Sequence, residues 1–155
     1  HISEDPVNRI QMMDKRQKKV EQILTLIPKN DQAVAYGKSD ICIVSWGSAK
    51  GPILDAIEMH RKEGHEIGFI DIKLLNPFPT DYIESLLKDS SVIIDVEANM
   101  TAQLGSLIRE NLLKDPDYYI LKYTGRPMTC VEIFDSLKKI LENKAEKRQV
   151  LLYGD

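Results

Sequence analysis

The chain has 155 residues, a net charge of −3 and 43% hydrophobic residues, which are ordinary values for one globular domain. They argue against a disordered tail or a phosphate-binding surface, so we expect neither nucleic acid nor a membrane as a partner. Its apolar runs are far shorter than the ~20 residues that cross a bilayer, and no signal peptide opens it, so we expect a cytoplasmic location. Because the chain begins at His1 without a methionine, we expect it to be a piece of a longer protein or to have lost its own start.

Cysteine and histidine are too few and too scattered to predict a metal or redox site. Cys42 and Cys130 cannot supply the four thiolates of an iron-sulfur cluster, and we expect both to be buried. His60 and His65 flank the end of a predicted helix, where positive charge is favourable, and they have no metal-ligand spacing. We therefore predict that the chain holds no catalytic, cofactor-binding or metal-binding residue.

Residues 5–27 are predicted to form one long connector helix. Asp5 is a good N-cap, Pro6 suits the first helical position, and apolar side chains recur on one side. The middle of the helix, residues 14–19, is fully polar. Apolar ends and a solvated centre are typical of a connector that lies across a surface.

A linker with one short strand follows the connector. Residues 28–40 contain turn-forming and polar residues, and residues 33–36 are the one apolar piece that suits an edge strand. We therefore divide the chain into a connector helix with its linker, residues 1–32, and one domain, residues 33–155.

The rest of the chain alternates between predicted strands and helices. Strands are expected at residues 41–46, 67–75, 91–97 and 118–123, and a helix follows each of them. Lys122 interrupts the last of these strands, which indicates a position near an edge of the sheet. Right-handed crossovers between such strands give a mostly parallel sheet with helices on both faces, a three-layer α/β/α fold.

Polar residues stand at the predicted starts of these helices. Ser48, Thr80 and Asn99 are expected to cap the first three helices. Thr129 and Glu132 have the spacing of a capping box for the fourth.

A ligand crevice is predicted between two central strands. Residues 41–46 and 91–97 are apolar on both faces, so we expect these strands to be neighbours. Neighbouring parallel strands that are not consecutive create a switch point, where a crevice opens beyond their carboxyl ends. The crevice loops would be residues 47–51 and 97–103, and we expect no other concave polar site.

The first crevice loop has the residue types of an anion site. It carries Ser48, Lys50 and Gly51 at a predicted helix start, where backbone amides can bind an anion. The loop lacks the spacing of a dinucleotide-binding turn or of a P-loop. Helix capping by Ser48 therefore remains the main interpretation.

The second crevice loop carries Glu97, Asn99 and Gln103, which can orient a substrate or supply a general base. No histidine, nucleophile or second carboxylate follows at a useful spacing, so capping and loop pinning are the main interpretation. Arg126 follows on a proline-stiffened turn, where its planar fork suits contact with another chain. Plain solvent exposure is the alternative for Arg126.

Four motifs follow one another along the domain. They are VSWGS at 44–48 with Gly51, LNPFP at 75–79, VEANMTAQL at 96–104 and KYTGRP at 122–127. In order and spacing they resemble the C-terminal part of the α subunit of 2-oxoacid:ferredoxin oxidoreductases. HISEDP at 1–6 and MMDKR at 12–16 resemble the connector of archaeal and bacterial members. The resemblance implies a transketolase C-terminal-like domain with a five-stranded mixed sheet, in which residues 33–36 form the antiparallel strand.

The same resemblance implies a place in an enzyme complex. The family oxidatively decarboxylates a 2-oxoacid, transfers the acyl group to coenzyme A and passes electrons to ferredoxin. Thiamine diphosphate, magnesium and an iron-sulfur cluster are implied in other domains and in the β subunit. The implied partners are the β subunit and the N-terminal domains of the same α subunit, with ferredoxin and coenzyme A at the level of the complex. We expect this fragment to be an inactive structural and assembly domain.

Three alternatives remain beside this reading. The first is a binding or regulatory module for a nucleotide or coenzyme A, and the second is a pure interaction domain. The third is the C-terminal domain of a thiamine-dependent 2-oxoacid dehydrogenase, a branch that typically has an aspartate after Phe78. One departure from the ferredoxin-linked pattern is Ala102, where that family usually has a glycine.

Overall fold

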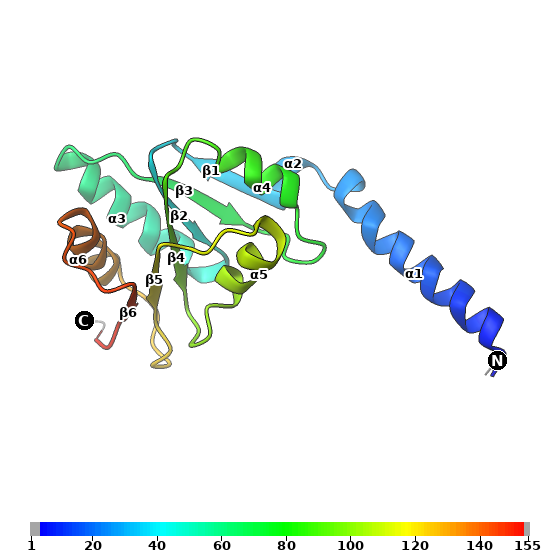
Figure 1. The fold of residues 1–155 in the computed structure, drawn as a ribbon. Coiled ribbons are helices and arrows are strands. Elements are labelled where there is room, and N and C mark those ends of the chain that lie inside the picture. The colour runs from blue at the N-terminus through cyan, green and yellow to red at the C-terminus, as the bar shows by residue number, and fades with distance from the viewer. Residues whose placement is uncertain (1–3, 154–155) are drawn as a thin grey trace.

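A six-stranded sheet forms the centre of the fold in the computed structural model, which describes residues 4–153 (Figure 1). The strands are β1 (Ala33–Tyr36), β2 (Ile41–Ser45), β3 (Gly68–Ile72), β4 (Val92–Glu97), β5 (Tyr118–Leu121) and β6 (Arg148–Val150). Their order is β1-β3-β2-β4-β5-β6, with β1 antiparallel to β3 and the other pairs parallel. The predicted mostly parallel sheet with one antiparallel strand is confirmed.

The expected number of five strands is wrong, because β6 adds a sixth. β6 is three residues long and begins with Arg148 and Gln149, so it lacks the apolar pattern that signals a strand. It pairs in parallel with β5 and covers the edge that β5 would otherwise expose. Lys122, which directly follows β5, therefore does not mark an edge strand.

Helices cover both faces of the sheet. They are α1 (Pro6–Leu26), α2 (Lys29–Gln32), α3 (Lys50–Lys62), α4 (Thr80–Leu86), α5 (Gln103–Leu112) and α6 (Cys130–Leu141), with a 3-10 turn, η1 (Gly47–Ala49), before α3. α3 and α6 lie on one face, and α4 and α5 lie on the other (Figure 1). The predicted three-layer α/β/α arrangement is confirmed.

Two apolar layers hold the helices to the sheet. Ile43 and Ile94 point from the central strands β2 and β4 into the layer under α3 and α6. Val44 and Ile93 point from the same strands into the layer under α4 and α5. This alternation explains why both strands are apolar on both faces in the sequence.

The connector helix α1 begins and ends close to the predicted positions, and it projects away from the α/β body (Figure 1). Its N-cap is Asp5, whose side chain accepts hydrogen bonds from the backbone N–H of Val7 at 3.0 Å and of Asn8 at 3.4 Å. No residue of α1 is buried. The motif that begins at His1 lies partly outside the described residues.

The last turn of α1 is tied to the body by Gln32. Its side-chain amide donates to the carbonyl oxygens of Leu24 at 2.9 Å and Ile27 at 2.7 Å. The backbone carbonyl oxygen of Gln32 accepts hydrogen bonds from the backbone N–H groups of Lys73 and Leu74, just beyond β3. The connector therefore meets the domain at a hydrogen-bonded junction.

The predicted helix caps are confirmed at two helices, α1 with Asp5 and α6, and wrong at three. Thr129 and Glu132 form the expected capping box of α6. The N-cap positions of α3, α4 and α5 are Ala49, Pro79 and Ala102, none of which makes a side-chain capping bond. Ser48 and Asn99 precede those positions, and Thr80 is the first residue inside α4.

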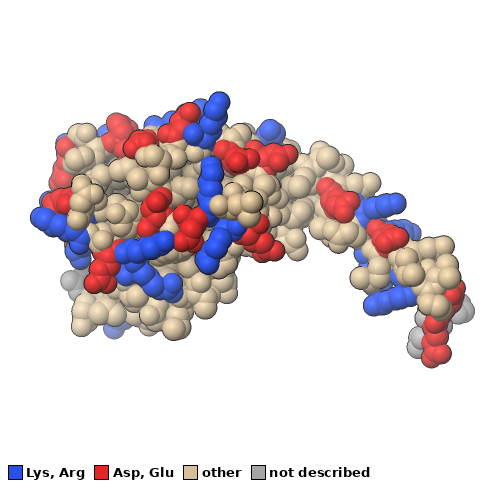
Figure 2. Space-filling model, viewed as in Figure 1, with Lys and Arg blue, Asp and Glu red and all other residues tan. Residues whose placement is uncertain are grey.

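Acidic and basic side chains are interspersed over the face of the body seen in Figure 2. This mixture accords with the small net charge of −3. Within residues 4–153, no helix has the length and apolar character needed to cross a membrane.

Candidate functional site

The predicted switch point lies between β2 and β4. The two strands pair in parallel from Ile41 opposite Val92 to Ser45 opposite Val96, and β3 lies on the other side of β2. The loops after β2 and β4 therefore leave the sheet in opposite directions from neighbouring positions. The predicted adjacency of these strands is confirmed.

Two pockets lie at this edge of the sheet and share Ser48 and Ala98. One has a volume of about 180 Å³ and is lined by Trp46, Gly47, Ser48, Ala98, Asn99 and Gln103. The other has a volume of about 570 Å³, and its lining includes Ser48, Pro52, Ala98, Lys122, Tyr123 and Arg126. We call the two together the carboxyl-edge groove, which runs across the ends of β2, β4 and β5.

Four of the predicted site residues line this groove, namely Ser48, Asn99, Gln103 and Arg126. Lys50 and Gly51 do not. The Lys50 ammonium lies 3.0 Å from Asp71 Oδ2 and 5.1 Å from the centre of the Tyr36 ring. Hydrogen bonds to Tyr36 and Asp71 raise the pKa of Lys50. Lys50 is therefore committed to β1 and β3 and is not part of an anion site in the groove.

Glu97 lies beneath the groove and is almost completely buried. Its carboxylate accepts hydrogen bonds from Trp46 Nε1 at 2.9 Å and Asn99 Nδ2 at 2.7 Å. It also accepts the backbone N–H of Leu104 at 2.8 Å, in the first turn of α5. Burial raises the pKa of Glu97, but these hydrogen bonds and one from Asp95 lower it overall. Glu97 pins the loop and the helix start, as its main interpretation predicted.

Asp95 is a buried partner of Glu97 that the sequence analysis missed. It is fully buried, and its Oδ2 accepts the backbone N–H of Gly105 at 3.1 Å. Burial, together with hydrogen bonding to Glu97, raises the pKa of Asp95 to about 9. The one available signal was an aspartate in the middle of the apolar strand VIIDVE. Carboxylates therefore fill the N-terminal end of α5, where an anion would otherwise bind.

Ala102 keeps the conformation that a glycine would favour. It has φ 54° and ψ 61°, in the left-handed region, and it is buried against Tyr119 and Leu121. Asn99 Oδ1 accepts the backbone N–H groups of Thr101 at 3.1 Å and Ala102 at 2.8 Å, which holds this turn. The loop therefore holds an alanine in a left-handed conformation at the position where the family pattern has glycine.

A buried ion pair supports the far wall of the groove. Lys122 Nζ lies 2.7 Å from both carboxylate oxygens of Glu132, and the Lys122 side chain has no solvent exposure. The same carboxylate accepts hydrogen bonds from the backbone and hydroxyl of Thr129. Sequence reasoning found the capping box but not this pair, because Lys122 looked like an edge residue.

Arg126 lies on the exposed loop between β5 and α6 and lines the larger pocket. It makes no hydrogen bond or ion pair with any of residues 4–153. Its guanidinium is thus an exposed cation in a groove wall, which agrees both with a contact residue and with plain solvent exposure.

Histidine and cysteine lie away from the groove. His60 is buried and stacks on Phe134, with Nε2 3.0 Å from the Phe134 carbonyl oxygen, and burial lowers its pKa. Cys42 is buried as expected, whereas Cys130 is only partly buried because it is the first residue of α6. Among the described residues, no group of three or more His, Cys, Asp or Glu side chains could hold a metal ion.

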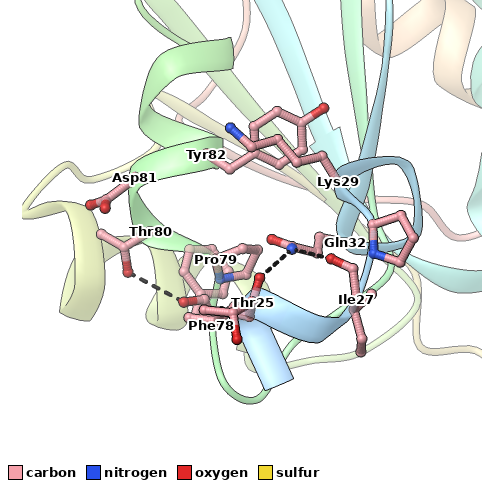
Figure 3. A pocket seen from close by; sticks show the side chains of 11 residues that line it. Thr25, Ile27, Lys29, Gln32, Phe78, Pro79, Thr80, Asp81 and Tyr82 are labelled. Atoms are coloured by element: carbon pink, nitrogen blue, oxygen red, sulfur yellow. Dashed lines mark hydrogen bonds between the residues drawn. The ribbon is translucent and has the colours of Figure 1, made fainter. Parts of the chain in front are cut away.

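A third pocket, of about 530 Å³, lies away from the groove, at the junction of α1 with the body (Figure 3). Its walls include Ile27, Gln32, Phe78, Pro79 and Tyr82, and the Lys29 ammonium lies 4.9 Å from the Tyr82 ring centre. The expectation of one concave polar site is therefore wrong. The sequence could not show this pocket, because it forms between a connector end and a loop that lie about 50 residues apart in the chain.

Comparison with known proteins identifies relatives of this domain. The family described as pyruvate:ferredoxin oxidoreductase core domain II matches residues 39–133. A curated relative, 2-oxoacid:ferredoxin oxidoreductase 2, subunit alpha, of Aeropyrum pernix, is 40% identical over 99% of this chain and 24% of its own length. The chain thus spans about a quarter of the length of such relatives.

Solved structures give the same picture. A 2-oxoglutarate:ferredoxin oxidoreductase from Magnetococcus marinus matches 88% of this chain and 24% of its own, with 26% identity and a TM-score of 0.74. The alpha chain of a probable 2-oxoacid ferredoxin oxidoreductase from Thermoplasma acidophilum is 43% identical over 72% of this chain and 98% of its own, with a TM-score of 0.51. A split-gene transketolase, 19% identical with a TM-score of 0.60, shares the fold.

Proposed function

This chain belongs to the pyruvate:ferredoxin oxidoreductase core domain II family, as part of a 2-oxoacid:ferredoxin oxidoreductase α chain, and we propose that it is a non-catalytic assembly domain of that subunit. The observation that supports this role is that the carboxyl groups around the groove are hydrogen-bonded within the domain. Glu97, Asp95 and Glu132 are each held by hydrogen bonds within the domain. Such carboxylates shape a surface and are not free to move protons to a substrate.

The complete enzyme would supply the chemistry. We propose that it oxidatively decarboxylates a 2-oxoacid to an acyl-CoA and reduces ferredoxin, with thiamine diphosphate, magnesium and an iron-sulfur cluster. Among the described residues, no cluster of His, Cys, Asp or Glu side chains fits a magnesium ion or an iron-sulfur cluster. In keeping with the family resemblance, we place these cofactors and thiamine diphosphate in other domains of the α subunit and in the β subunit.

The division of the chain into a connector, residues 1–32, and a C-terminal transketolase-like domain, residues 33–155, is part of the same proposal. It is supported by α1, which has no buried residue and projects from the body (Figure 1). The partners would be the N-terminal domains of the same subunit and the β subunit. We propose a cytoplasmic location in an archaeal or bacterial cell, where ferredoxin and coenzyme A are available to the complex.

The alternative of a nucleotide or coenzyme A module has less support. Such a site would need several donors for a phosphate group. Lys50 pairs with Asp71, and the N–H groups of Leu104 and Gly105 at the start of α5 bind Glu97. Lys122 is paired with Glu132, so Arg126 is the one cation left in the groove wall without an ion-pair partner among the described residues, which is little positive charge for a phosphate-containing ligand.

A deletion experiment tests the assembly role. The full-length α subunit and the same subunit lacking the segment equivalent to residues 33–155 are each purified with the β subunit. We expect the intact complex to reduce ferredoxin with a 2-oxoacid and coenzyme A, and the shortened subunit to fail to hold the β subunit on size exclusion. A shortened complex that assembles and turns over normally would refute the proposal.

The isolated chain provides the second arm of this test. We expect it to have no iron-sulfur absorption and no calorimetric binding of thiamine diphosphate. The Thermoplasma acidophilum alpha chain, 98% of which is matched by 72% of this chain, is a precedent for a shorter, related chain crystallising. Cluster absorption in the purified chain, or binding of thiamine diphosphate at micromolar affinity, would contradict a non-catalytic role.

A further inference from the structure

We propose that the carboxyl-edge groove docks an acidic protein segment of the same oxidoreductase, and that Arg126 binds a carboxylate of that segment. The inference rests on the proposed function, because the occupant is another part of that complex. The chain spans about a quarter of the length of its curated relatives, so most of the subunit lies outside the structure and can supply the segment.

The charge of the groove selects the occupant. Lys122 and Arg126 line it, and no aspartate or glutamate does. Both carboxylate oxygens of Glu132 neutralise Lys122. Arg126 has no hydrogen-bond or ion-pair partner within the described part of the chain. The groove therefore presents one uncompensated cation, which favours a partner that carries a negative charge.

The loop that carries Arg126 is held at both of its ends. Lys122, at its start, and Glu132, in the first turn of α6, form the buried ion pair. Met128 is buried in the core next to the Thr129 cap. Binding at Arg126 therefore orders little more than its own side chain, which lowers the entropic cost of docking.

Three exposed apolar side chains follow the strands that form the groove. Trp46 follows β2, Met100 follows β4 and Tyr123 follows β5, with exposed fractions of 38%, 62% and 46%. The Trp46 indole is fixed by its hydrogen bond to Glu97, and the Met100 carbonyl oxygen accepts from the Arg148 guanidinium. Trp, Tyr, Met and Arg are enriched at protein interfaces. A protein segment that pairs an acidic side chain with apolar neighbours fits these residues.

The arrangement favours a carboxylate over a phosphate group. The guanidinium fork binds a carboxylate through two parallel hydrogen bonds. A phosphate group would need further donors, but Lys50 and the amides at the start of α5 are already bound to Asp71 and Glu97. One guanidinium fork beside exposed Trp46 and Tyr123 is the chemistry of a protein contact.

Photo-cross-linking in the complete enzyme tests the proposal. A benzophenone amino acid replaces Tyr123 in the full-length α subunit, which is purified with the β subunit, irradiated and digested for mass spectrometry. We expect a cross-linked peptide that lies outside this domain and contains aspartate or glutamate. Arg126→Ala should lower the cross-link yield roughly tenfold, the scale of a strong interface residue.

The matched control is Arg61→Ala, an exposed arginine on α3 that pairs with Glu58. We expect this control to leave the yield unchanged. A cross-link confined to this domain, a yield indifferent to Arg126→Ala, or a cross-link displaced by millimolar inorganic phosphate or coenzyme A would overturn the proposal. Displacement would assign the groove to a small anion.

A charge exchange provides the second test. Arg126→Glu should abolish the cross-link, and replacing the identified partner acid by arginine in the same complex should restore it. Absence of restoration would contradict a direct ion pair. Ferredoxin reduction by the wild-type complex is measured separately. Turnover without the cross-link would reject only this inference, whereas absence of turnover would reject the proposed function.

Discussion

Asp95 and Glu97 lie on the same face of β4, and both carboxyl groups accept the backbone N–H of Gly105, at 3.1 Å and 3.3 Å. One N–H at the start of α5 therefore ties two buried carboxyl groups to the helix. Burial and hydrogen bonding between the two groups raise the pKa of Asp95, whereas the pKa of Glu97 is lowered, so one of the pair is neutral while the other keeps its charge. The pair fixes α5 against the sheet without placing two charges in the core.

The close approach at Gly105 predicts a large effect of adding one methyl group. A Cβ at this position would lie 2.6 Å from Asp95 Oδ2 and 2.7 Å from Tyr119 Cε1. We expect Gly105→Ala to destabilise the chain by about 2 kcal/mol, the scale of overpacking. Urea unfolding measures it, with Gly51→Ala as the control, because nothing lies within 4 Å of a Cβ there. Equal effects of the two substitutions would contradict the packing at Gly105.

Protonation of Asp95 predicts that stability falls as the pH rises above neutrality. The folded pKa of about 9 lies far above the unfolded value of roughly 3.9, so between them the folded chain holds a proton that the unfolded chain has lost. The contribution is complete below the unfolded pKa and is lost as the pH rises through the folded pKa. We expect a loss of up to about 1 kcal/mol between pH 7 and pH 8.

Between pH 7 and pH 8, the effect of Asp95 on stability can be distinguished from the effects of other titrating groups. The lowered pKa of His60 affects stability below neutral pH, and the pKa of Cys42, raised to about 12, affects it at higher pH. Asp95→Asn keeps a donor toward Glu97. It should therefore flatten the dependence of the free energy of unfolding on pH in this window. Asp55→Asn, at an exposed position on α3, is the control. A wild-type free energy of unfolding that does not fall between these pH values would show that Asp95 is already charged at pH 7.

Leu113 predicts a stabilising substitution at the end of α5. It is the C-cap residue with φ 55°, in the left-handed region, and 89% of it is exposed. Leu113→Gly should raise the free energy of unfolding by about 0.5 kcal/mol, because glycine adopts this conformation without strain and little packing is lost. Leu113→Ala keeps the Cβ and should give no gain. The idea fails if thermal unfolding ranks the two variants equally.

The Lys122–Glu132 pair predicts a strongly non-additive response. Lys122→Met leaves the Glu132 carboxylate without its cation in a site where 13% of its side chain is exposed. We expect a loss of about 3 kcal/mol, the scale of breaking a buried pair. Adding Glu132→Gln should recover part of this loss, because the remaining charge is removed. A double-mutant cycle by urea unfolding measures the coupling, and additive single effects would contradict it.

We expect Arg126→Ala to weaken docking in the complex but to leave the stability of the isolated chain almost unchanged. Because it has no partner within residues 4–153, Arg126→Ala should change the stability of the isolated chain by less than ~0.5 kcal/mol. Thermal unfolding of the isolated chain measures it. A loss above ~2 kcal/mol would assign Arg126 to a buried network of the domain.

Much of the fold followed from the apolar pattern. β2 and β4 were placed together because both are apolar on both faces, and the structure pairs them. β6 was missed because three polar-rich residues carry no pattern, and it exists because the edge of β5 accepts it. Patterns report burial, whereas a short edge strand depends on its neighbour.

The candidate site was predictable only in part. Ser48, Asn99 and Gln103 were found because they follow central strands, where parallel topology brings loops together. The roles of Lys50 and Lys122 could not be predicted from the sequence. Each lysine depends on a partner, Asp71 or Glu132, that only folding brings within reach. A lysine in the sequence does not show whether its charge faces solvent or a buried carboxylate.

The junction at Gln32 makes α1 a rigid lever. The helix has 21 residues, so it is about 30 Å long, and a tilt of roughly ten degrees at its last turn would move its far end by about 5 Å. One side-chain amide, which holds the carbonyl oxygens of Leu24 and Ile27, resists that tilt. A small change in the hydrogen bonds of Gln32 would thus displace the N-terminal end of α1 by about the length of one helical turn.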